Sequence, residues 1–196
     1  MSRAHSIGLI GLSCVIALSS GAVRAQKNAG IEYRILATSK TSTMEKELND
    51  AAESGFRFVT VMGGETAIGG KEAISVMSRH PGEKSRFMYK LLATSKTSSM
   101  QKEMQEAADA GFEYRDQTVF ETLMGGKEVV CIMERDKDQS TAGKYQYKLL
   151  ATTRTSTMQK ELQEIGDQGY EALGMTIAKT LVGGKELVVI SRRPVK

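Results

Sequence analysis

Three times along the chain, apolar and polar residues alternate in near-copies of one segment, beginning at Tyr33, Tyr89 and Tyr147. A two-residue period predicts a β-strand; in the first copy Ile35 shares the face of Tyr33, and Leu36 lies on the other face. The segment recurs after 56 residues and then after 58. A repeat at this spacing predicts three copies of one structural module.

A helical period follows each predicted strand. In the first copy, apolar residues at Met44 and Leu48 predict a helix that lays one apolar stripe on a sheet, and Gly55 stands where a left-handed residue ends a helix. Ser42-x-x-Glu45 fits the capping box, in which both side chains bind free backbone donors at the helix start. The equivalent pairs are Ser98-x-x-Gln101 and Ser156-x-x-Gln159.

Two more strands complete each module. One starts at the aromatic residue after the helix-ending glycine, and a Gly-Gly turn, beginning at Gly69 in the first copy, leads to the other. The last strand is apolar on both faces, which predicts a central position. The fold class is therefore α+β, with three tandem βαββ modules, each a three-stranded antiparallel sheet in the order 1-3-2 with one helix on one face. The modules are predicted at 31–79, 86–135 and 145–194.

The face of each sheet away from its helix is also expected to be apolar, with Leu36, Leu92 and Leu150 on it. So much apolar area predicts that the three sheets pack together, face to face or edge to edge, about a pseudo-threefold axis. Modules of about 50 residues bury too little surface to be stable alone. We expect each one to depend on its neighbours.

Residues 1–25 read as a secretion signal. Arg3 precedes an apolar stretch over 7–23, which ends in Val23-Arg24-Ala25, the form of a cleavage site. Cleavage after Ala25 predicts a periplasmic or secreted protein. An uncleaved membrane anchor is the alternative, although glycines and serines interrupt the stretch, and no later segment has the length and apolarity of a membrane span.

Charge and cysteine content narrow the classes of partner. The formal net charge of +4 falls to +2 when the signal is removed, and no basic patch remains, so nucleic acid is not expected as a partner. Cys131 would be the one cysteine left, which excludes an intramolecular disulfide. It falls in a central strand, where we expect a buried, inert thiol.

A resemblance to a known family accompanies these features. The Tyr-Lys start of the first strand, Gly-aromatic-Glu at Gly111-Phe112-Glu113 and at Gly169-Tyr170-Glu171, and the ending Arg192-Arg193-Pro194 are similar to the small bacterial domain of unknown function numbered 4177. Three tandem copies would cover nearly all of the mature chain. The chain differs in having no tryptophan, and Arg57 replaces the glutamate in the first copy. The resemblance implies the fold and no activity.

The strand-to-helix connectors are the candidate ligand site. Each places a cation among hydroxyl groups ahead of a helix N-terminus, an arrangement that suits a small anionic ligand. The alternative is that these residues only cap the helix and solvate the loop. The candidate residues are Lys40, Ser42, Lys96, Ser98, Arg154 and Ser156.

No catalytic motif is present: the chain has no Gly-x-Ser-x-Gly, no His-Glu-x-x-His and no phosphate-binding glycine loop. The methionines could suggest copper, but Met44 and Met77 fall at core positions and no clustered Met motif appears, so no metal or cofactor is predicted. We therefore expect a non-catalytic cell-envelope protein that binds a protein partner or itself. The alternatives are a periplasmic binder of an anionic ligand and an enzyme of unrecognised type.

Overall fold

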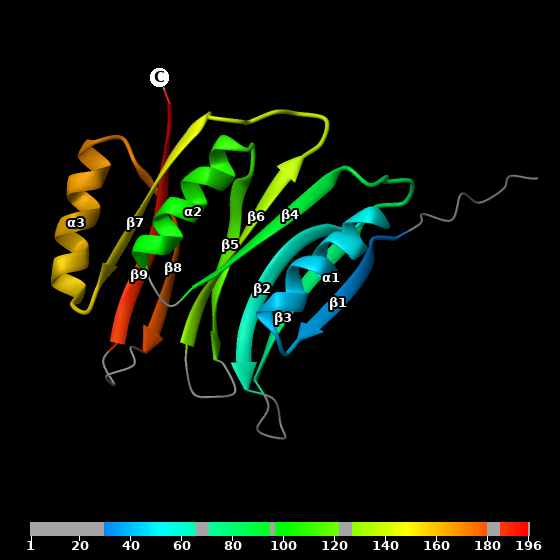
Figure 1. Ribbon diagram of the computed structural model, residues 1–196, viewed down its shortest axis with the longest axis horizontal. Helices are drawn as coiled ribbons and strands as arrows, with labels where there is room; N and C mark the ends of the chain where they lie inside the picture. The colour runs from blue at the N-terminus through cyan, green and yellow to red at the C-terminus, as the bar shows by residue number, and fades with distance from the viewer. Residues whose placement is uncertain (1–29, 66–70, 95–96, 122–126, 180–184, 196) are drawn as a thin grey trace, which may run out of the picture.

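The computed structural model describes residues 30–65, 71–94, 97–121, 127–179 and 185–195 (Figure 1). Three modules follow one another, each with the order strand, helix, strand, strand. The first comprises β1 (Glu32–Thr38), α1 (Thr41–Glu53), β2 (Arg57–Glu65) and β3 (Lys71–Arg79). The second comprises β4 (Phe87–Thr94), α2 (Thr97–Asp109), β5 (Glu113–Glu121) and β6 (Lys127–Asp136). The third comprises β7 (Tyr145–Thr152), α3 (Thr155–Asp167), β8 (Glu171–Lys179) and β9 (Lys185–Pro194).

Each module forms an antiparallel three-stranded sheet in the order β1-β3-β2, β4-β6-β5 or β7-β9-β8. The predicted fold class is confirmed. The central strand is apolar on both faces because both are covered: Val130, Cys131, Ile132 and Met133 of β6 are all fully buried. The predicted Gly-Gly turns, which begin at Gly69, Gly125 and Gly183, lie outside the described residues.

One face of each sheet packs on the helix of its own module. In the third module, Met158 and Ile165 of α3 share a cluster with Leu150, Leu187 and Val189. The prediction that the repeated leucines lie on the face away from the helix is wrong, since Leu150 and Leu92 pack on their own helices. Because side chains alternate along a strand, the tyrosine of each first strand points to the opposite face.

The modules form a row in which helices and sheets alternate (Figure 1). Helix α1 lies against β4 of the second module as well as against its own sheet, and α2 lies likewise against β7 of the third. Met44 and Leu48 of α1 therefore share one core with Tyr89, Val130 and Ile132 of the second sheet. The expected threefold arrangement is wrong, because α1 and α2 each have a second face that holds the next sheet, which extends the row in one direction.

The helix ends match the sequence only in part. Gly55, Gly111 and Gly169 follow the helices with φ of 85°, 89° and 82°, as predicted for residues that end a helix. The capping-box prediction is wrong for α1 and α3: the residues before them are Lys40 and Arg154, and neither makes a side-chain capping bond. Because these helices begin one residue before the serine, the serine lies inside the first turn.

The predicted core positions of several methionines and of the cysteine are confirmed, whereas Met62 and Met175 are exposed. Met44, Met77 and Met133 are buried, and Cys131 is buried and free. Among the helices of the described ranges, none combines the length and the apolarity that a membrane span requires.

Candidate functional site

Side chains of one module's helix bind the backbone of the next module's first strand. The amide of Asn49 donates to the carbonyl of Tyr89 and accepts from its N–H, both at 2.9 Å. In the second helix, Gln101 donates to Tyr147 O and accepts from Leu149 N, both at 2.7 Å. These bonds satisfy an edge strand that would otherwise present free backbone groups.

A second amide extends this pairing by one turn of the second helix. Gln105 donates to Tyr145 O at 3.2 Å and accepts from Tyr147 N at 3.0 Å. In the first helix Asn49 is the counterpart of Gln105, and the counterpart of Gln101 is Glu45, whose carboxylate accepts from Leu91 N at 2.9 Å. Positions four residues apart lie on one helix face, so two side chains can bind alternate residues of the strand.

The tyrosine of the covered strand forms a second contact. The hydroxyl of Tyr89 accepts from Phe58 N at 2.7 Å and donates to Glu134 at 2.8 Å. At the next boundary Tyr147 repeats the first bond and accepts from Tyr114 N at 2.9 Å. Burial raises the pKa of both phenols, so both stay protonated and neutral at physiological pH.

An ion pair crosses each boundary, and the positive and negative residues occupy opposite sides at the two boundaries. Arg57 of the first module contacts Glu134 of the second at 2.8 Å, whereas Glu113 of the second contacts Arg192 of the third at 3.1 Å. Both pairs join equivalent positions of the repeat. Glu134 also raises the pKa of Arg57 through their hydrogen bond.

The last contact joins the edges of β2 and β5. Asp116 accepts from the hydroxyl of Thr60 at 2.9 Å and from Val61 N at 3.1 Å, and Thr118 Oγ1 accepts from Gly63 N at 2.7 Å. The strands approach so closely that a Cβ on Gly63 would lie 2.1 Å from the carbonyl oxygen of Val119. Glycine is therefore required there.

The first sheet has the same apolar face but no neighbour on it among the described residues. Tyr33 is 65% exposed, whereas its counterparts Tyr89 and Tyr147 are 2% and 3% exposed. Ile74 is 42% exposed, and the equivalent Val130 is fully buried. We call this surface the head face; it consists of Tyr33, Ile35, Met62 and Ile74.

The third module presents the other half of a boundary. Gln159 and Gln163 of α3 stand at the positions of Gln101 and Gln105 and are exposed. Met175 is 58% exposed, although Val61 at the equivalent position is buried against the next module. We call this surface the tail face; it consists of Gln159, Gln163, Met175 and the equally exposed Ile177.

The predicted anion site is divided among three separate connectors. The starts of α1, α2 and α3 lie in different modules along the row (Figure 1). In the first connector, hydroxyl groups already bind carboxylates: Thr38 donates to Glu47, and Thr41 donates to Glu128 at 3.4 Å. Nearby carboxylates disfavour an anion. The candidates Lys40, Ser42, Ser98, Arg154 and Ser156 are exposed, and Lys96 lies outside the described residues.

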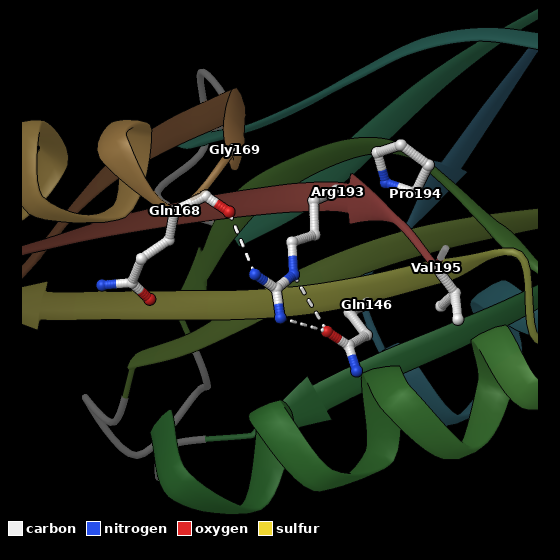
Figure 2. Close-up of a pocket in the computed structure, with 6 residues that line it drawn as sticks. All are labelled: Gln146, Gln168, Gly169, Arg193, Pro194 and Val195. Atoms are coloured by element: carbon white, nitrogen blue, oxygen red, sulfur yellow. Dashed lines mark hydrogen bonds between the residues drawn. The ribbon is translucent and has the colours of Figure 1, made fainter.

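A shallow hollow of about 460 Å³ lies at the end of α3 (Figure 2). Its arginine, Arg193, donates to the backbone carbonyl of Gln168 at 3.0 Å and to the side chain of Gln146 at 2.8 Å. Arg79 binds the equivalent carbonyl of Ser54 at 2.7 Å. This arginine therefore closes the helix end in the repeat, and each of its three guanidinium nitrogens already donates a hydrogen bond within the chain.

At the equivalent place in the first module, the end of α1 is covered by the chain that leads to the second module. There the backbone oxygen of Glu83, in the connection to the second module, would lie 2.6 Å from a Cβ on Gly55. Gly169, at the edge of the hollow, has no such neighbour. The hollow is thus the place where a connection to a following module would run.

Two further features bear on chemistry in the part of the chain that the structure describes: groups that could bind a metal, and the histidine of the first connection. The described residues contain no group of three or more His, Cys, Asp or Glu side chains that could hold a metal ion. His80 is exposed, and its backbone N–H binds Glu83.

The helix side chains that bind the next module were not predicted from the sequence. Their signal was present: a carboxylate or amide side chain recurs in each helix at two positions four residues apart, Glu45 and Asn49, Gln101 and Gln105, and Gln159 and Gln163. Comparison with protein-family models, with curated proteins and with solved structures gives no match for this chain.

Proposed function

We propose that this protein is a non-catalytic, exported scaffold of the cell envelope that acts by binding protein through the head face. One observation carries the proposal: Tyr33 and Ile74 are exposed at the end of the row, whereas the equivalent tyrosines and valines of the other two modules are buried at boundaries. Contiguous exposed apolar surface on a folded protein is typical of an interaction site.

The composition of the head face supports a protein partner. It combines the aromatic ring of Tyr33 with the flexible side chain of Met62 and the branched side chains of Ile35 and Ile74. Tyrosine and methionine are enriched in protein interfaces. The face also ends in the edge strand β1, whose outer backbone groups can pair with a partner.

Site-specific photocrosslinking in the native host tests this function. A photoreactive amino acid replaces Ile35, and the matched control carries it at Lys46, which is exposed on the helix of the same module. We expect light-dependent adducts with protein at position 35 and none at position 46. The absence of adducts at position 35, in cells that accumulate the folded protein, would contradict the proposal.

The predicted export has its own measurement. The intact mass of the protein recovered from the envelope fraction should correspond to a chain that begins at Gln26. A mass that retains the first 25 residues would favour the membrane-anchor alternative.

A further inference from the structure

We propose that the partner of the head face is the tail face of a second copy of this chain, so that copies associate head to tail. The inference rests on the proposed function and names its partner. It follows from the two internal boundaries, each of which joins a tail-type surface of one module to a head-type surface of the next. Among the described residues, the first module has a head-type surface without a neighbour, and the third module has a tail-type surface without one.

The backbone pairing can be assigned residue by residue. By the repeat, Gln159 takes the part of Gln101 and bonds Tyr33 O and Ile35 N of the second copy. Gln163 takes the part of Gln105 and bonds Ile31 O and Tyr33 N. Gln163 already shares one feature with Gln105, because both amides donate to an aspartate one turn further along the helix.

The second boundary also shows which side chains of the tail face and the head face would meet. At the second boundary, Gln117 donates to Thr176 at 3.2 Å and to the carbonyl of Val188 at 3.3 Å. The equivalent of Gln117 on the tail face is Met175. The equivalents of Thr176 and Val188 on the head face are Met62 and Ile74. Methionines thus stand at the ends in place of the polar side chains of Gln117 and Thr176, and Ile74 stands in place of the apolar Val188. Met175, Met62 and Ile74 are all exposed.

The hollow at Gly169 adds an independent observation. In the first two modules the connection to the next module covers this position: the backbone of Glu83 lies over Gly55, and Gly143 N binds Ala108 O at the end of α2. The hollow at the end of α3 is therefore open at the place that these connections cover in the first two modules.

One element of the internal boundaries is missing at the ends. In the third module Glu171 stands at the position of Arg57 and Glu113. The residue it would face in the first module is Ser78, which stands at the position of Glu134 and Arg192. No ion pair forms between these positions. We therefore expect the contact between copies to be weaker than the internal boundaries and to depend on concentration.

The interface is heterologous, so each added copy leaves one head face and one tail face free. Such contacts build rings or filaments and do not stop at two. This separates the proposal from a symmetric dimer in which two head faces meet.

The test blocks one end at a time and then mixes the two variants. Tyr33→Arg disables the head face and Met175→Arg disables the tail face; both residues are exposed in the single chain, so folding is retained. Lys84→Glu and Glu164→Arg are the matched controls, because these residues are exposed and lie outside both faces. Each protein is expressed from its full-length gene, purified, and studied by sedimentation velocity from about 1 to 500 µM.

We expect the unaltered protein and both controls to form species larger than a dimer as concentration rises. Each blocked variant alone should stay monomeric, with association weakened at least about tenfold. An equimolar mixture should form a dimer and no larger species, because one intact head meets one intact tail. Circular dichroism with urea midpoints equal to the unaltered protein establishes that the variants are folded.

Three results would overturn the inference: an unaltered protein that is monomeric throughout, a Met175→Arg variant that still dimerises, or a mixture that remains monomeric. If the protein is monomeric but position 35 crosslinks to a different protein, the head-to-tail partner is wrong and the proposed function stands. If neither association nor crosslinking occurs, both fail.

Discussion

The three equivalent tyrosines provide a direct test of how far the modules stabilise one another. Tyr33, Tyr89 and Tyr147 occupy the same position of the repeat, but only the last two are buried at a boundary. Replacing each with alanine in turn therefore removes the same atoms from the same local structure. Differences in the free energy of unfolding report the boundary contacts.

The expected losses follow from burial and hydrogen bonding. Removing a buried aromatic side chain costs about 3–5 kcal/mol, and we expect about 4 kcal/mol for Tyr89→Ala. Tyr33→Ala should change stability by less than about 0.5 kcal/mol, since its side chain is mostly in water. Tyr89→Phe should cost about 1–3 kcal/mol, because Phe58 N and Glu134 lose a buried partner.

Urea unfolding followed by circular dichroism measures these changes. The protein should be at the lowest practical concentration, so that contacts between copies do not add to the stability. Tyr147→Ala is expected to resemble Tyr89→Ala. Equal losses for Tyr33→Ala and Tyr89→Ala, or a loss below about 1 kcal/mol for Tyr89→Ala, would refute the conclusion that the boundary stabilises the fold.

Three further predictions follow from the structure. Gly63→Ala should destabilise by at least about 1–3 kcal/mol in urea unfolding, because the new methyl meets Val119 O, whereas Gly64→Ala, with open space around it, should be neutral. Burial raises the pKa of the Cys131 thiol, so a thiol reagent should label it only as fast as the protein unfolds, as mass spectrometry would show; rapid labelling of the folded protein would contradict this. Burial also raises the pKa of Tyr89 above its value of about 10 in the unfolded chain, so the neutral phenol stabilises the fold fully below about pH 10. Above that pH the free energy of unfolding should fall by about 1.4 kcal/mol per pH unit. Tyr89→Phe should flatten this fall in alkaline unfolding curves, and an unchanged slope would refute the prediction.

The sequence predicted the interior of each module because local patterns determine it. The alternation after Tyr33, the apolar stripe of Met44 and Leu48, and the two-sided apolar strand around Cys131 each limit one element to one conformation. Once the first and second strands require a crossover, the third fits between them. The order 1-3-2 follows from chain connectivity, and the structure has it.

The sequence did not predict which face of the sheet meets which neighbour. Both faces of the first strand are apolar, so Leu36 and Ile35 were equally suited to the helix side. The choice depends on the far side of α1, where Asn49 and Glu45 bind β4. Glu45 was read as part of a capping box because the spacing fits, but its carboxylate binds the next module. A contact between modules determines both the sheet face that meets the helix and the role of Glu45. The residue pattern within one module does not reveal that contact.

The exchanged ion pairs indicate why the three copies have diverged. If the second and third modules changed places, Arg57 would face Arg192, and two like charges would meet at a boundary. The charge pattern therefore favours the observed order of modules and disfavours the wrong one. At the ends of the row, Glu171 and Ser78 do not form a pair of opposite charges. Selectivity there depends on the amides of α3 and the apolar side chains, which suits a contact that forms and dissociates with concentration.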